Sequence, residues 1–254
     1  GGGSGDGSIS MTDDSLKKAL EDLGCEEGED AEPLDNTMAS EFRALAARTN
    51  YLAGDRTGIM YAAKGICRHM ANPSKGAWKK LKRLGRYLLG SGRLITKYDW
   101  QGDEDTVTGY SDSDWAGGRV TGKSTSEDAI MIGGHFIKGW ARTQNNVTLS
   151  SAEAELYAMV EGATRARGMI TLAQELGFTS LGSTITLGTD SSAAKSFVNR
   201  RGVGRMRHLA IRDLWLQKEV AEGKVLVEKV AGELNPADLM TKILAWGEVV
   251  TRLN

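Results

Sequence analysis

The sequence predicts an α/β fold, with a mixed five-stranded sheet flanked by helices and preceded by a small helical segment. The first observation is the order of the expected elements after residue 106, βββαβααβα, which is typical of a mixed sheet covered by helices. The second is a set of five short runs with strand patterning: 107–112, 128–132, 135–141, 184–187 and 225–230. The third is helical patterning over 151–176, from 192, over 209–222 and after Pro236.

Composition places the chain among globular proteins. Its 254 residues, 40% of them hydrophobic, suffice for one ordinary domain and a smaller neighbour. We expect an intracellular protein without a membrane span, because no run of about 18 apolar residues occurs and residues 1–10 lack the features of a signal peptide. The two cysteines, Cys25 and Cys67, have neither disulfide-framework nor zinc-site spacing, which favours a reducing compartment.

The net charge of −1 conceals a strong segregation of charge along the chain. Residues 6–35 hold eleven acids, whereas residues 75–97 hold eight bases and no acid. Residues 1–35 therefore have the composition of a disordered acidic linker.

The segment 36–100 is expected to be mainly helical, with a strand at 94–100. One of its helices places Ala77, Leu81, Leu84 and Leu88 on one apolar face. The rest of that helix is basic, so we expect it to contact nucleic-acid phosphates through Lys79, Lys82 and Arg86.

Cleavage of a phosphodiester requires charge stabilisation at the attacking and leaving oxygens, which two Mg²⁺ ions about 4 Å apart supply when several carboxylates converge on them. Acids at strand ends and helix starts are therefore the candidates. The first is Asp112, because a carboxylate in a buried strand is costly without a partner or a metal, whereas Asp114 fits the following turn.

Two glutamates open the longest expected helix, and their positions predict different roles. With Ser150 as the N-cap, Glu153 completes a capping box and needs no further explanation. Glu155 lies on or beside the core-facing side of the helix, so it is the candidate ligand.

Two further acids are ambiguous when taken singly. Asp190 ends a strand, and it could instead cap the next helix. Asp238 follows Asn235 and Pro236, which already form a complete helix start, so its acid could be structural. The combination with Asp112 and Glu155 raises the odds for both, since these positions can converge in a βββαβααβα sheet.

Five motifs together resemble the ribonuclease H domain of copia-type LTR retrotransposon Pol polyproteins. They are, in order, YSDSDWAG at 110–117, KSTS at 123–126, LSSAEAE at 149–155, TD at 189–190 and ADLMTK at 237–242. The preceding stretch is similar to the end of the reverse transcriptase of the same polyprotein, with NYLA at 50–53, DRT at 55–57, KR at 82–83 and RYLLG at 86–90. The resemblance implies a thumb or connection remnant over 36–100 and a ribonuclease H domain over 106–246.

The resemblance further implies a ribonuclease H-like sheet and hydrolysis of the RNA strand of RNA–DNA hybrids. The metal ligands and catalytic residues would be Asp112, Glu155, Asp190 and Asp238, holding two Mg²⁺ ions for which Mn²⁺ can substitute. The implied partners are the hybrid and the polymerase part of the same polyprotein, in a cytoplasmic retrotransposon particle. Many cellular ribonucleases H carry a loop histidine before the last acid; residues 230–235 have none, so Glu233 substitutes or turnover is slow.

Binding of a hybrid also needs bases for its phosphates and small polar groups for its 2′-hydroxyls. The predicted contacts in the second half of the chain are Lys123, Ser124, Thr125, Asn145, Asn146, Arg200, Arg201, Arg205 and Arg207. For the basic segment 200–208, a solvated face without a ligand is the structural alternative.

Two other functions compete with a hybrid nuclease. An integrase or transposase would also use clustered acids, but the expected pair of Asp and Glu about 35 residues apart does not follow Asp190. A degenerate, catalytically weak or inactive module could bind hybrids without cutting them, although all four acids are present.

Overall fold

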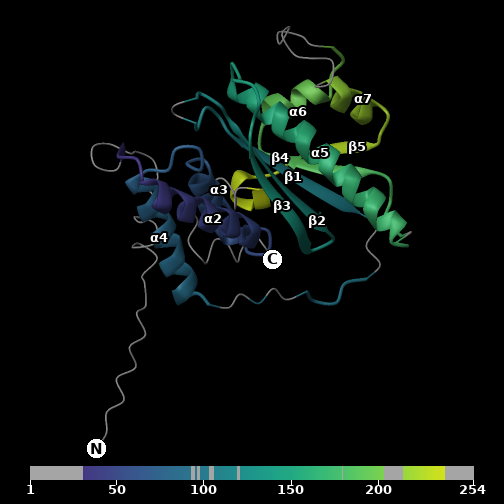
Figure 1. Ribbon diagram of the computed structural model, residues 1–254. Coiled ribbons are helices and arrows are strands. Elements are labelled where there is room, and N and C mark those ends of the chain that lie inside the picture. Colours follow the sequence, from purple (N-terminus) through teal and green to yellow (C-terminus); the bar gives the residue numbers. More distant parts are fainter. Residues whose placement is uncertain are drawn as a thin grey trace, which may run out of the picture. The chain divides into compact units, whose positions relative to one another are not determined.

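The computed structural model describes residues 31–92, 95, 98–102, 106–118, 121–178, 180–202 and 214–237. The chain divides into two compact units near residue 96. We call the first the helical unit and the second the sheet unit (Figure 1). Within the described residues, no helix is both long and apolar enough to span a membrane.

The helical unit is built from α2 (Asn36–Ala53), α3 (Met60–Cys67) and α4 (Lys75–Gly90), with a short 3-10 helix, η2 (Thr57–Ile59). Asp35 and Ser74 cap α2 and α4, because their side chains accept hydrogen bonds from the N–H groups of Met38 and Ala77. The core of the unit comprises Phe42, Ala46, Ile59, Ala63, Ile66, Ala77, Leu81 and Leu84.

The apolar face predicted for α4 is confirmed, since Ala77, Leu81 and Leu84 are buried and Leu88 packs against the same core. The strand expected over 94–100 is wrong for the residues that are described there. Ile95 and residues 98–100 lie outside any strand, and Trp100 is almost fully exposed. Without a neighbouring strand to complete its hydrogen bonds, an apolar run does not form a sheet.

The sheet unit contains one five-stranded sheet in the order β3-β2-β1-β4-β5. β1 (Val107–Asp114), β2 (Thr125–Ile132) and β3 (His135–Thr143) form an antiparallel meander, whereas β4 (Ile185–Thr189) pairs parallel with β1 and β5 (Val225–Lys229) pairs parallel with β4. This mixed sheet is the ribonuclease H-like arrangement that the resemblance implied.

Three helices complete the described part of this unit: α5 (Ser151–Glu175), α6 (Ser192–Val198) and α7 (Trp215–Ala221). α5 lies across β1 and β2 (Figure 1). Gly109 and Gly162 allow this close approach, because a Cβ on Gly162 would lie 2.9 Å from the Asp128 carboxylate. The predicted order βββαβααβ is confirmed, and the last helix, expected after Pro236, lies outside the described residues.

The core between α5 and the sheet is continuous and apolar. It includes Val107, Ile130, Leu156, Met159, Ile170, Ile185, Leu187, Phe197, Leu216 and Val225. Complete burial of one such side chain contributes roughly 1.5–3 kcal/mol, so this packing holds the edge of the sheet and the start of α5 in a fixed relation.

Candidate metal centre

Three acidic residues meet at one edge of the sheet. Asp112 lies near the carboxyl end of β1, and Asp190 directly follows β4, the parallel neighbour of β1. Because parallel neighbours end at the same edge, the two side chains come together there. Glu155 belongs to the second turn of α5, which begins at this edge.

The three side chains are close enough to share a metal ion. One carboxylate oxygen of each lies within 4.8 Å of those of the other two. Asp112 and Glu155 are buried, with 7% and 8% of their surface exposed, whereas Asp190 is more accessible. We call these three residues the acidic triad.

Repulsion within the triad is visible in the titration of Glu155. The pKa of its carboxyl group is raised from 4.5 to about 8, chiefly by burial and in addition by the neighbouring charges of Asp112 and Asp190. The hydroxyl and N–H groups of Ser113 offset only part of that shift. The Glu155 Oε2 atom is buried and has no hydrogen-bond partner among the described residues.

This donor set fits a divalent cation. Carboxylate oxygens are the ligands that Mg²⁺ and Mn²⁺ prefer, and a cation would supply the positive charge that the three acids lack as a group. The structure does not identify the ion.

The structural role predicted for Glu153 is confirmed. The Ser150 hydroxyl accepts a hydrogen bond from the Glu153 N–H at 3.2 Å, and Glu153 Oε2 accepts one from the Leu149 N–H at 2.8 Å. Glu153 is thus occupied at the start of α5, and it is Glu155 that joins the triad.

The structural alternative for Asp190, capping the next helix, is not what the fold uses. Ser191 is the N-cap of α6, and its hydroxyl accepts from the Ala194 N–H at 3.2 Å. Asp190 therefore has no capping function that would explain its position.

Asp238, the fourth predicted ligand, lies outside the described residues. The segment leading to it is anchored to β1 through Asn235, which is completely buried. The Asn235 amide donates to the Ser111 carbonyl at 3.1 Å and accepts from the Ala237 N–H at 3.1 Å. Sequence reasoning had assigned Asn235 only to a helix start and missed this link to the strand that carries Asp112.

Comparison with known proteins shows which proteins this chain is similar to. A retrovirus-related Pol polyprotein from transposon RE2 of Arabidopsis thaliana is 28% identical over 209 residues, which are 81% of this chain and 14% of the relative. The polyprotein from transposon RE1 of the same plant is 29% identical over 212 residues, which are 82% of this chain and again 14% of the relative. Over about four fifths of its length, the chain is therefore similar to retrovirus-related Pol polyproteins of transposons.

This similarity to Pol polyproteins confirms the resemblance carried by the motifs. The chain spans only 14% of the length of these two Pol relatives. No protein-family model matches the chain. Among solved structures, ribonuclease H1 from the archaeon Halobacterium salinarum aligns over 52% of this chain and 90% of its own, with 17% identity and a TM-score of 0.36.

The predicted nucleic-acid contacts of this chain fall into three groups. Lys79, Lys82 and Arg86 are exposed on α4 of the helical unit, and the Lys82 ammonium lies 5.8 Å from the centre of the Trp78 ring. In the sheet unit, the exposed members are Asn145, Asn146, Arg200 and Arg201. Arg205 and Arg207 lie outside the described residues.

The remaining predicted contacts, in the loop before β2, differ in accessibility. Lys123 is half-buried, whereas Ser124 and Thr125 are buried. The Ser124 hydroxyl accepts from the Ala116 N–H at 3.1 Å and lies 2.8 Å from the Thr148 hydroxyl. Ser124 therefore ties two loops together, which does not favour direct contact with a substrate.

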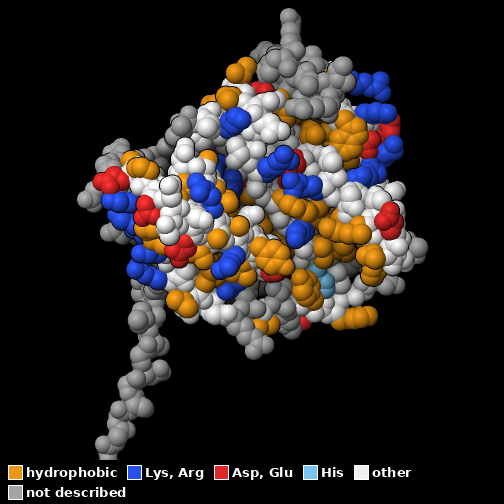
Figure 2. All heavy atoms as spheres, viewed as in Figure 1, with side chains coloured by type: hydrophobic (Ala, Val, Ile, Leu, Met, Phe, Trp, Pro, Cys, Tyr) orange, Lys and Arg blue, Asp and Glu red, His pale blue; other side chains and the backbone are white. Residues whose placement is uncertain are grey.

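Positive charge is not gathered in one patch on the face drawn in Figure 2. Lys and Arg side chains occur in several places there, interspersed with hydrophobic ones.

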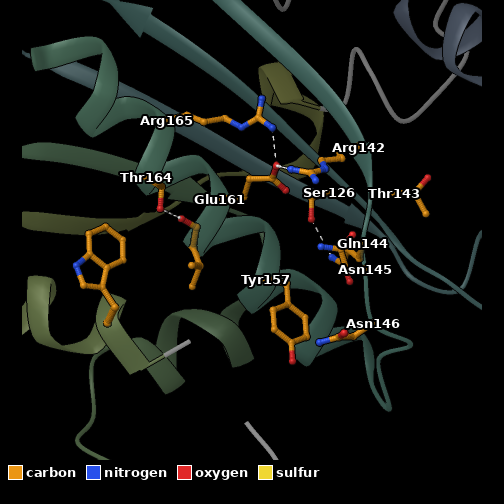
Figure 3. A pocket seen from close by; sticks show the side chains of 12 residues that line it. Ser126, Arg142, Thr143, Gln144, Asn145, Asn146, Tyr157, Glu161, Thr164 and Arg165 are labelled. Carbon is orange, nitrogen blue, oxygen red and sulfur yellow. Dashed lines mark hydrogen bonds and ion pairs between the residues drawn. The ribbon is translucent and has the colours of Figure 1, made fainter. Parts of the chain in front are cut away.

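A hollow of about 740 Å³ lies on the α5 side of the sheet (Figure 3). It is lined by polar and aromatic side chains from β2, β3, the following loop, α5 and α7. They are Ser126, Arg142, Thr143, Gln144, Asn145, Asn146, Tyr157, Val160, Glu161, Thr164, Arg165 and Trp215. Sequence reasoning found only Asn145 and Asn146, because no spacing rule joins residues from such separated segments.

Proposed function

We propose that this chain hydrolyses the RNA strand of RNA–DNA hybrids, as the ribonuclease H part of a retrotransposon Pol polyprotein. The observation that carries the proposal is the acidic triad, in which β1, α5 and β4 each contribute one carboxylate oxygen within 4.8 Å of the others. The sheet order and the similarity to Pol polyproteins support the same reaction.

Asp112, Glu155 and Asp190 would hold the metal, with Asp238 as the fourth ligand. Two Mg²⁺ ions bound at such a site stabilise the charge on the attacking and leaving oxygens and lower the pKa of water. The buried positions of Asp112 and Glu155 fix their carboxylates before substrate arrives, which avoids reorganisation during the reaction. Deprotonation of Glu155 is required for metal binding, so binding of the metal and loss of that proton are coupled.

The substrate would be held by groups on both sides of the reacting phosphate. Asn145 and Asn146 offer amides to ribose 2′-hydroxyls, and Lys123, Arg200 and Arg201 offer charge to the phosphates. Glu233 is exposed in the segment where many cellular enzymes carry a histidine, so slow product release is expected. The polymerase part of the polyprotein would be the natural partner, within a cytoplasmic particle.

The direct test is incubation of the chain with a labelled RNA–DNA hybrid and Mg²⁺. Cleavage of the RNA strand, with single-stranded RNA and duplex DNA left intact, is the expected result. Binding of the hybrid without any cleavage in Mg²⁺ or Mn²⁺ would instead support a degenerate hybrid-binding domain.

A further inference from the structure

The hollow on the α5 side of the sheet has a polar floor in which Gln144 is oriented by the fold. The Gln144 side chain is only 8% exposed, and its Nε2 group lies 2.9 Å from the Ser126 hydroxyl and 2.8 Å from the Ala154 carbonyl. A carbonyl oxygen can only accept, so the atom that faces Ala154 must be the amide NH₂. The orientation of the amide follows from this contact.

This orientation leaves the side-chain oxygen of Gln144 as a hydrogen-bond acceptor without a donor. Gln144 Oε1 is buried and has no hydrogen-bond partner among the residues that the structure describes. A buried acceptor left in this state costs about 1–3 kcal/mol, which a ligand carrying an N–H or O–H group would recover. A ligand that binds in the hollow should therefore donate a hydrogen bond to Gln144 Oε1.

The charges around the hollow are largely balanced, apart from one arginine. Arg165 pairs with Glu161, lies 3.6 Å from the buried carboxylate of Asp128, and stacks 4.6 Å from the centre of the Trp140 ring. Figure 3 shows Arg165, Glu161 and Arg142 together at one end of the hollow. Among the described residues, Arg142 forms an ion pair only with Glu161, at 3.8 Å, and 62% of its side chain is exposed. It is the cation available to an anionic ligand.

The other walls are aromatic or carry amides. Tyr157 on α5 and Trp215 on α7 are half-buried, and each packs against the core on one side. Asn145 and Asn146, which are exposed, offer both donors and acceptors, and Figure 3 shows Asn146 beside the Tyr157 ring. The occupant should therefore have a flat apolar face, edges that donate and accept, and a single negative group.

We propose that this hollow binds one unpaired nucleotide, with its base against Tyr157 and Trp215, an N–H of the base on Gln144 Oε1 and its phosphate on Arg142. Each nucleobase carries an edge N–H, and an unpaired, unstacked nucleotide can offer both this edge and the face of its base to the protein. Aromatic side chains bind unpaired bases irrespective of sequence, since all bases have a π-face.

The position of the hollow indicates where that nucleotide would belong. Ser126 is the cross-strand partner of Ser113, the residue after Asp112, and Ala154, which anchors Gln144, precedes Glu155. A nucleotide bound there would adjoin the cleaved duplex as a single-stranded extension. Only this assignment rests on the proposed function; binding of the nucleotide itself does not.

Binding is tested with adenosine 5′-monophosphate and the metal-free chain. The side-chain amide signals of Gln144, Asn145 and Asn146 are followed by nuclear magnetic resonance during the titration. Saturable shifts of these signals are expected with the nucleotide. No shift, or equal shifts with inorganic phosphate or with a disaccharide at the same concentration, would overturn the assignment to a nucleotide.

Variants separate the base from the phosphate. Arg142→Gln should weaken binding of the monophosphate but not of adenosine, whereas Tyr157→Ala should weaken both roughly fivefold or more. Since Tyr157 packs against the core, its replacement could destabilise the fold, so the variant is checked by thermal unfolding. Asn146 is exposed, so Asn146→Ala provides a second test of binding without loss of core packing. Lys138→Gln and Phe178→Ala, matched exposed residues outside the hollow, should change neither affinity. An effect of the controls equal to that of the variants would contradict the site.

The assignment to a single-stranded extension is tested by cleavage kinetics. Hybrids with an unpaired RNA extension should have a lower KM than blunt hybrids, and Arg142→Gln and Tyr157→Ala should remove this difference while kcat on blunt hybrids stays the same. An equal KM for both substrates in the unaltered chain would refute this assignment. If the chain cleaves no hybrid but its amide signals still shift with the nucleotide, the proposed nuclease function fails and the binding site stands.

Discussion

The two units of this chain differ in where they place their ionisable side chains. The sheet unit buries like charges together, since Asp112 and Glu155 are almost inaccessible and meet Asp190 within 4.8 Å. The helical unit spreads its charges over a surface, since Lys79, Lys82 and Arg86 are all exposed on α4. Buried carboxyl groups this close together need a specific counter-ion before all of them can ionise, whereas exposed charges interact at long range and are screened by salt. We therefore expect the sheet unit to carry the catalytic reaction. We expect the helical unit to contribute salt-dependent affinity for nucleic acid.

The largest effect is expected from Asp112→Asn. The amide keeps the shape of the side chain but removes the charge that holds a divalent ion, so cleavage of a hybrid should fall by about a hundredfold or more. Binding of the hybrid, measured by fluorescence anisotropy, should be retained. Asp55→Asn, at an exposed acid of the helical unit, is the control and should leave the rate unchanged. Normal cleavage by Asp112→Asn would mean that the triad is not the metal site.

The two glutamates of α5 provide the sharpest comparison within the sheet unit. Glu155→Gln should abolish cleavage, because it removes a triad carboxylate. Glu153→Gln should keep cleavage and lower the free energy of unfolding by about 1 kcal/mol or less, through the weakened cap. Both quantities are measured on both variants, by initial rates and by chemical denaturation. Exchange of the two phenotypes would reverse the assignment.

Repulsion in the triad should make the stability of the metal-free chain depend on pH. Between pH 4.5 and about 8 the folded state keeps a proton on Glu155 that the unfolded chain has released, so the folded state binds more protons. The free energy of unfolding should therefore fall as the pH rises through this window. Mg²⁺ should raise the melting temperature by a few degrees at pH 8 and by less at pH 5.

Thermal unfolding in a chelator and in Mg²⁺, at both pH values, measures this effect. Glu155→Gln is the matched variant, because it has no group to titrate and should lose that part of the pH dependence. An identical response to Mg²⁺ at pH 5 and pH 8 would argue against coupling between the proton and the metal.

The smallest effect on the reaction is expected from the basic helix. Replacement of Lys79, Lys82 and Arg86 by glutamine should flatten the slope of log affinity against log salt by up to about 3 units, since each phosphate contact contributes roughly 0.9. The rate at saturating hybrid should stay nearly the same. Arg48→Gln, at an exposed base on α2, is the control. An unchanged slope in the triple variant would leave α4 as a solvated helix that never meets substrate.

Local sequence rules were sufficient where one segment decides the outcome. Ser150 and Glu153 are three residues apart, so the start of α5 and the different roles of Glu153 and Glu155 could be predicted from spacing alone. The same holds for the strand that carries Asp112. Strand patterning gave a wrong prediction at 94–100, where the described residues 95 and 98–100 lie outside any strand.

The sequence by itself determined the resemblance to Pol polyproteins, the order of strands and helices along the chain and the three acids of the triad, because motifs and periodicity are properties of contiguous residues. Tertiary structure decided which side chains from distant segments share a site. Gln144 is fixed by Ser126 and by Ala154, Asn235 is fixed by Ser111, and Arg165 is placed beside Asp128. These contacts depend on the packing of α5 on the sheet, in which residues far apart along the chain lie a few ångströms apart, and no local spacing encodes such distances.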